Sequence, residues 1–302
     1  MASSARGRRS ADRLLFLGPA TLMLVVFFLL PVIVNVGIAF TDMGRNLQVT
    51  QFTTENVARM LGGDRRLVGV MGTTLVYVLC TLAIFNVGYA LALALLTTSL
   101  PERTGAFFRS VWLLPRMSPS VVYALLWSWV VAPTDYGLLN QGLTAFGFAP
   151  VDMKSNAPML LVVLANGFIG ASFGMIIFTS AIRSIPEHLF HAARVDGAGG
   201  LAIVWHITLP QIRWQVSFVT LYQALSLLVS FEYIWLITDG GPFYDTTVYA
   251  LYVYKRAFEN GQYAYGAALA LGLVVIGIAL ALVLWRFFDM RALLQKPRIE
   301  VS

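Results

Sequence analysis

The chain has 302 residues, of which 58% are hydrophobic and 12% are charged, and its mean hydropathy is +0.74. So few polar groups cannot cover a water-soluble globule of this size, which excludes the soluble classes and predicts an integral membrane protein. The net charge is +6, but no basic run carries interleaved aromatic residues, so we expect no nucleic-acid partner. The bilayer admits only helices and closed barrels, and the apolar runs far exceed the roughly 10-residue segments of a barrel. The sequence therefore predicts an all-α membrane protein.

Six apolar runs of about 20 residues or more follow one another along the chain, and each is long enough to span a bilayer as a helix. They are residues 14–40, 68–97, 106–131, 158–182, 211–237 and 263–288. The first run follows a basic start but is longer than the roughly 7–15 apolar residues of a secretory signal, so we expect it to be retained. Pro31, Pro115 and Pro119 fall inside the runs and are expected to kink them. The prediction is six transmembrane helices in a single domain, residues 1–302.

The distribution of Lys and Arg predicts the orientation of these helices. With Arg116 left inside the third run, thirteen of the 21 Lys and Arg residues lie on the side of the two termini, and seven lie on the other side. Because positive charge accumulates in cytoplasmic loops, we expect both termini and the loop between the fourth and fifth runs in the cytoplasm.

That loop, residues 184–210, is a polar island between two apolar runs. Ser184 and Glu187 have the spacing of a capping box, so we expect a short helix to begin there. Gly197 and the pair at 199–200 should end that helix, because glycine readily takes the left-handed conformation found at helix ends. A second short helix should then lead to Leu209 and the fifth span.

The motifs of this loop resemble the coupling loop of permease subunits in ATP-binding-cassette importers. In order they are Ala192-Ala193, three residues, Gly197, nine residues, and Ile207-x-Leu209-Pro210. The resemblance implies that the loop docks on a cytoplasmic ATPase. The residues implied in that coupling are Glu187, His191, Ala192, Ala193, Asp196, Gly197, Ile207, Leu209 and Pro210. His191 departs from the family, which most often has a glutamate there, because a neutral imidazole cannot supply a carboxylate's negative charge.

Other motifs extend the resemblance over nearly the whole chain, to permeases of maltose-type carbohydrate importers. They are residues 17–20, 107–109, 136–140 and the external Gly-Gly-Pro turn at 238–242. The resemblance implies the type I importer permease fold in the bacterial inner membrane. It also implies three partners: a second permease that completes a heterodimer, a cytoplasmic ATPase dimer that binds ATP and Mg, and an extracytoplasmic sugar-binding protein. No cofactor is expected in the chain itself, because it has no P-loop motif and no His/Cys metal-ligand cluster.

The fourth and fifth runs contain polar and aromatic side chains, which are costly in lipid and mark either helix contacts or a transport path. The resemblance places a sugar path at Asn166, Phe168, Ile169, Gly170, Phe173, Gln223, Ser226, Leu227 and Ser230. The alternative is that the polar residues form interhelical hydrogen bonds and the phenylalanines only pack. Arg116 could snorkel or line a cavity.

Two other functional classes stay open at this stage. A secondary transporter driven by ions would usually show internal repeats and ionisable residues near mid-membrane, and we find no clear repeat. A membrane-embedded enzyme would need a catalytic set, but the candidates His191, His206 and Glu232 are far apart in the sequence. We therefore predict no catalytic residues and no metal site.

Overall fold

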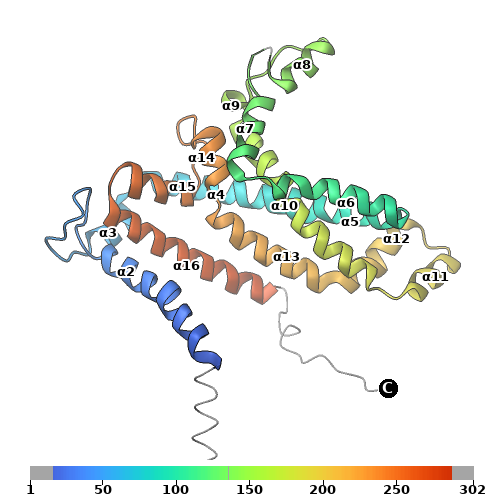
Figure 1. Ribbon diagram of the computed structural model, residues 1–302, viewed down its shortest axis with the longest axis horizontal. Coiled ribbons are helices and arrows are strands. Elements are labelled where there is room, and N and C mark those ends of the chain that lie inside the picture. The colour runs from blue at the N-terminus through green and yellow to red at the C-terminus, as the bar shows by residue number, and fades with distance from the viewer. Residues whose placement is uncertain (1–15, 135, 288–302) are drawn as a thin grey trace, which may run out of the picture. The chain divides into compact units, whose positions relative to one another are not determined.

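The computed structural model describes residues 16–134 and 136–287, which are helical along most of their length (Figure 1). One isolated antiparallel bridge pairs Thr41 with Phe52 in this part of the chain. With π-helical segments written η, the helices are η1 (Val25–Leu29), α2 (Leu30–Ala39), α3 (Glu55–Ala58), η2 (Arg59–Gly63), α4 (Arg65–Cys80), η3 (Thr81–Tyr89), α5 (Ala90–Ser99), α6 (Glu102–Met117), α7 (Ser120–Val130), α8 (Leu138–Ala145), α9 (Met153–Asn156), α10 (Pro158–Arg183), α11 (Glu187–Val195), α12 (Gly200–Ile203), η4 (Val204–Thr208), α13 (Leu209–Val229), α14 (Glu232–Thr238), α15 (Tyr249–Tyr254), η5 (Lys255–Glu259) and α16 (Tyr263–Phe287).

Among the described residues, four continuous helices are long and apolar enough to cross a membrane: Phe16–Ala39, Arg65–Ser99, Pro158–Arg183 and Tyr263–Arg286. A fifth candidate is the pair Gly200–Val229 and Glu232–Thr238, which is bent by 50° at its break. These five correspond to five of the six predicted runs.

The third predicted run, residues 106–131, is not one continuous helix. It is divided between α6 and α7, and the chain is extended at Ser118 and Pro119, with ψ values of 142° and 140°. Proline has no backbone N–H and disfavours helical geometry in the residue before it, so Pro119 ends α6 rather than kinking it. Pro115, by contrast, lies inside α6.

The described residues form two compact units, which we treat separately. The first includes residues 16–65 and 253–274, and the second includes residues 66–252 and 275–287. In the first unit, Tyr265 donates a hydrogen bond to Asp64 at 2.6 Å, and Asn35 donates to the carbonyl of Ala267 at 3.3 Å. The guanidinium of Arg59 lies 4.0 Å from the centre of the Tyr265 ring. These contacts tie the start of α16 to the amino-terminal segment.

The second unit is organised around α10. Its apolar window is 67% buried, compared with 39% for the helix Arg65–Ser99, and α10 packs along η3, α5, α6 and α13 (Figure 1). Three glycines explain the close approach to η3 and α5. An added Cβ would lie 2.3 Å from the Phe85 ring at Gly167, 2.1 Å from the Asn86 side chain at Gly170, and 2.6 Å from the Asn86 carbonyl at Gly174. Small residues of this kind let membrane helices pack backbone to side chain.

The close contact of the α10 glycines with η3 and α5, called the glycine seam below, predicts that Gly174→Ala destabilises the protein. The new methyl group would meet the backbone of η3 and the Ala90 side chain, which cannot move aside without distorting the helix. Overpacking of this kind costs about 1–3 kcal/mol. The measurement is the thermal unfolding midpoint of the purified protein in detergent. Gly72→Ala in α4 is the matched control, since an added Cβ there meets nothing within 4 Å. Equal midpoints for the two variants would show that close packing at the glycine seam does not limit stability.

Candidate functional site

The loop between α10 and α13 carries its first short helix, α11, where the sequence predicted one. The predicted capping box, however, is wrong: the Ser184 hydroxyl donates to the Ala181 carbonyl at 2.7 Å, and Pro186 occupies the position before the helix. The reason is that Ser184 still belongs to the end of α10, where its backbone N–H donates to Ser180 at 3.2 Å. Extended backbone at Pro186 then separates it from Glu187.

Gly197 ends α11 with φ of +79°, as predicted. The next amide, of Ala198, donates to the Ala193 carbonyl at 2.9 Å, which is the hydrogen bond of a glycine-terminated helix. An added Cβ at Gly197 would meet nothing within 4 Å, so the left-handed backbone and not crowding favours glycine here. The expected second short helix is not separate, because α12 and η4 continue into α13 as one helix, Gly200–Val229.

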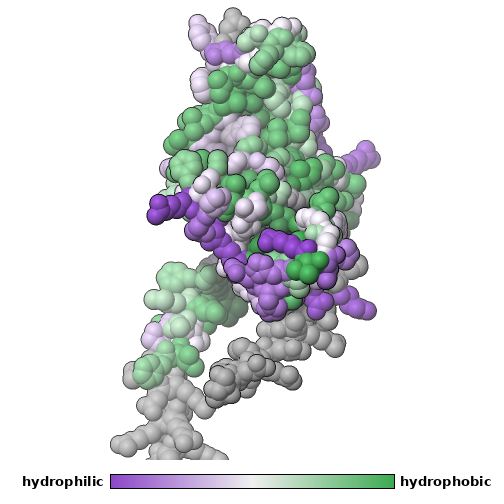
Figure 2. All heavy atoms as spheres, turned by 90° about the vertical axis from the view of Figure 1, so that its right-hand side faces the viewer, coloured by the Kyte–Doolittle hydropathy of each residue, from purple (hydrophilic) through white to green (hydrophobic). Residues whose placement is uncertain are grey.

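Most of the predicted coupling residues lie on the outer side of this loop, but Ile207 packs inward against a buried cluster. Glu187, His191, Ala192, Asp196, Gly197 and Pro210 are exposed, whereas Ala193, Ile207 and Leu209 are half-buried. The inner side of the loop, including Leu189 and Phe190, packs against the buried cluster that contains Ile182 and Ile212. Large apolar side chains also remain exposed, at Val195, Leu201 and Trp205. Figure 2 views this end of the second unit and shows hydrophilic residues gathered on it.

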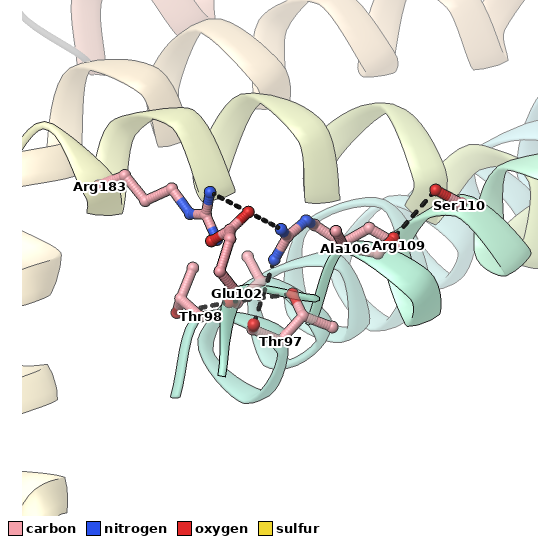
Figure 3. A network of polar contacts seen from close by, with 8 residues as sticks. Thr97, Thr98, Glu102, Ala106, Arg109, Ser110 and Arg183 are labelled. Carbon is pink, nitrogen blue, oxygen red and sulfur yellow. Dashed lines mark hydrogen bonds and ion pairs between the residues drawn. The ribbon is translucent and has the colours of Figure 1, made fainter. Parts of the chain in front are cut away.

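An ion cluster holds the end of α10 from which the loop departs (Figure 3). Arg183, the last residue of α10, donates to the Glu102 carboxylate through both terminal nitrogens, one of them at 2.9 Å. Arg109 donates to the same carboxylate at 3.2 Å and to the Thr97 carbonyl at 3.1 Å. The hydrogen bond from Arg183 is the main cause that lowers the pKa of Glu102 below its ordinary value. The cluster thereby connects the turn between α5 and α6 to the start of the loop.

At the other end of α10 and α13 the second unit contains a cavity of about 310 Å³. Seven of the nine predicted path residues line it. Its lining residues are Asn86, Arg116, Asn166, Ile169, Gly170, Tyr222, Gln223, Ser226, Leu227, Ser230 and Tyr233. Gln223 donates to the Gly170 carbonyl at 2.8 Å, and Asn166 donates to the hydroxyls of Tyr77 and Ser230. The cavity wall is therefore polar and held in place by hydrogen bonds between helices.

Phe168 and Phe173, the other two predicted path residues, are not among the lining residues. Phe168 packs in an aromatic cluster, stacked on Trp112 with a ring-centre separation of 5.4 Å. Phe173 stacks on Tyr222 at 4.9 Å, beside the cavity. Both therefore make aromatic contacts behind or beside the cavity wall.

Four lining residues were not assigned to the path from the sequence: Asn86, Arg116, Tyr222 and Tyr233. Asn86 carried a usable signal, because it is an amide inside an apolar run. It lies in the π-helical segment η3, and π-helical turns frequently occur at functional sites. The shift in helical register at such a turn is why the face of Asn86 could not be predicted from spacing alone.

Comparison with known proteins identifies the family. Residues 86–292 match the model of binding-protein-dependent transport system inner membrane components. The chain belongs to this family. It is therefore a membrane-embedded permease component of a transport system.

Several relatives resemble this permease over nearly its full length. A probable ABC transporter permease of Pyrococcus horikoshii is 30% identical over 287 residues, which cover 91% of this chain and 96% of that protein. The multiple sugar-binding transport system permease protein MsmF of Streptococcus mutans is 29% identical, with 87% and 90% covered. A solved bacterial ABC transporter involved in the import of the acidic polysaccharide alginate superposes with a TM-score of 0.82 at 20% identity, covering 96% of this chain and 99% of that one. The fold is therefore that of type I importer permeases.

Asn86 gives a test of the cavity. It is 1% exposed, and neither amide atom has a hydrogen-bond partner within the described chain. Asn86→Leu keeps the shape and removes the unpaired polar atoms, so we expect an unchanged or higher unfolding midpoint together with weaker transport. The matched control is Asn140→Leu: Asn140 is 2% exposed but makes three hydrogen bonds to the backbone of Ala132 and Val151. Asn140→Leu should therefore lower the free energy of unfolding by about 1–3 kcal/mol. Equal destabilisation of both variants would contradict this assignment.

The ion cluster predicts that Glu102→Gln loosens the loop. Hydrogen–deuterium exchange of residues 184–210 should be faster in this variant, because Arg183 loses its charged partner. Glu102 of the unmodified permease is charged at neutral pH, and because its pKa is lowered in the folded protein, protection should be lost only when the pH falls through that lowered pKa. Glu55→Gln on α3 is the control. Unchanged exchange of the loop in Glu102→Gln would show that the cluster does not hold it.

Proposed function

We propose that this permease is one of two subunits that together form the membrane pore of an ATP-driven carbohydrate importer. The observation that carries the proposal is that α10 and α13 both border the polar cavity and both lead into the exposed loop of residues 184–210. Amide and hydroxyl groups of the cavity can pair with sugar hydroxyls, and the tyrosine rings can cover C–H faces. The cargo in the name of MsmF supports a carbohydrate for this chain.

A second permease subunit would complete the pore. Arg116, Tyr222 and Ser226 line the cavity yet remain exposed in this chain alone, so the cavity is open on one side. A second subunit would close that side. The first span, Phe16–Ala39, also leaves most of its surface for a partner or for lipid, since 6% of its apolar window is buried within the described chain.

The remaining partners follow from the orientation. With both termini and the loop of residues 184–210 in the cytoplasm of a bacterial cell, the loop would dock on a dimer of ATPases that binds ATP and Mg. An extracytoplasmic sugar-binding protein would deliver the cargo. The chain itself would hydrolyse no ATP, since its sequence has no phosphate-binding loop motif. Closure of the ATPase dimer would move the loop and switch the cavity between the two sides of the membrane.

The docking role predicts different effects for two glycine substitutions. Gly197 and Gly147 have nearly equal φ values, +79° and +80°, and both open onto empty space. Aspartate therefore imposes the same backbone strain, about 1–2 kcal/mol, at each position. Gly197→Asp should lose both co-purification of the ATPase in detergent and ATP-driven sugar uptake by proteoliposomes. Gly147 follows α8, in a loop expected on the opposite side of the membrane from the ATPase, so Gly147→Asp should keep the ATPase bound.

His191→Glu should retain transport, because the exposed position on α11 accommodates a carboxylate and restores the charge that the family usually has there. Full uptake by Gly197→Asp would contradict docking of residues 184–210 on the ATPase. Loss of the ATPase from Gly147→Asp as well would contradict it too.

A further inference from the structure

Arg116 is the single charged residue among those that line the cavity. It lies one residue before the end of α6, and its guanidinium carbon is 5.5 Å from the centre of the Phe173 ring. Contact with an aromatic face orients a guanidinium without neutralising its charge. Within the described residues no carboxylate lies within 4.0 Å of this guanidinium. Arg116 therefore presents a full positive charge to the cavity.

Glu232 does not form an ion pair with Arg116 among the described residues. Glu232, at the start of α14, accepts a hydrogen bond from the Ser120 hydroxyl of α7, and it is not among the residues that line the cavity. Arg116 is exposed on the open side of the cavity, and closure of that side would remove the guanidinium from water, where an unpaired charge is costly. The described residues supply no paired counter-charge for it, so a ligand in the closed cavity can provide one.

Asn86 is a second, independent sign that a ligand completes this cavity. Its side chain is 1% exposed, and neither amide atom has a partner among residues 16–134 and 136–287, although buried polar atoms in proteins are nearly always hydrogen-bonded. It reaches the cavity beside Gly170, where an added Cβ would come within 2.1 Å of its amide oxygen. The cavity thus offers an unpaired amide donor together with an unpaired cation.

We infer that the cavity takes a carbohydrate that carries an acidic group, a carboxylate or a phosphate ester, with Arg116 as its counter-charge and Asn86 as a further hydrogen-bond partner. This inference rests on the proposed function, since it names the class of sugar that the pore accepts. A planar guanidinium donates two parallel hydrogen bonds to either kind of acidic group, which gives geometric selectivity over a neutral sugar.

The test uses the complete importer, with its second permease, ATPase and binding protein, in proteoliposomes. The probes are mono- to pentasaccharides in matched sets, each neutral sugar beside its uronic acid and its phosphate ester. We expect ATP-driven uptake of an acidic member over its neutral match. Arg116→Gln should raise the KM for that acidic sugar about 10- to 100-fold, the usual strength of a hydrogen bond to a charged group. Arg116→Lys keeps the charge but loses the paired hydrogen bonds, so its KM should lie between those of the unmodified permease and Arg116→Gln. Arg103→Gln, on the same helix outside the cavity, should change nothing.

The possible failures are distinguishable. Uptake of neutral sugars only, with Arg116→Gln unaffected, would overturn the inference and leave the proposed function intact. Equal loss of neutral and acidic uptake in Arg116→Gln, with the second permease lost on purification, would assign Arg116 to pairing with that subunit and also overturn it. If no carbohydrate of any set is taken up with ATP, the proposed function itself fails.

Discussion

Three glycines of α10 allow its backbone to lie directly against the helix formed by residues 65–99, and the arrangement of the second unit follows from that contact. Gly170 has no side chain to push Asn86 away, so this amide is buried at the cavity wall without a partner. The carbonyl of Gly170 meanwhile accepts a hydrogen bond from Gln223 of α13. The glycine seam therefore sets how closely α10 approaches its neighbours, and it places polar groups in the space between them.

The same helices connect this cavity to the loop of residues 184–210. Because α12, η4 and α13 form one continuous helix, the loop is connected to Gln223 without a break in the helix. At the end of α10, Glu102 ties the turn before α6 to Arg183. The loop thus combines a continuous helical connection to the cavity wall with an exposed outer face. In the proposed importer this is the route by which ATPase closure would reach the cargo.

Sequence reasoning was strongest where one local rule decides the outcome. Apolar runs marked five spans, and Gly197 ended α11 with a positive φ as expected. It failed where two rules compete at neighbouring residues. Pro119 breaks the third run because its effect on the backbone exceeds the drive to continue a helix. Ser184 had capping-box spacing but lies on the wrong side of an extended proline. Asn86 could not be placed, because a π-helical segment changes which residues face the cavity.

In the proposed importer, the cavity between α10 and α13 opens alternately to the two sides of the membrane. Cys80 is the single cysteine of the chain, so a Cys80→Ala background permits one reporter at the exposed, cavity-lining Ser226. The measurement is labelling of Ser226→Cys in the reconstituted importer by a membrane-impermeant thiol reagent added outside. Labelling should be slow without nucleotide and fast when the ATPase is trapped with ATP. Labelling that does not respond to nucleotide would contradict alternating access.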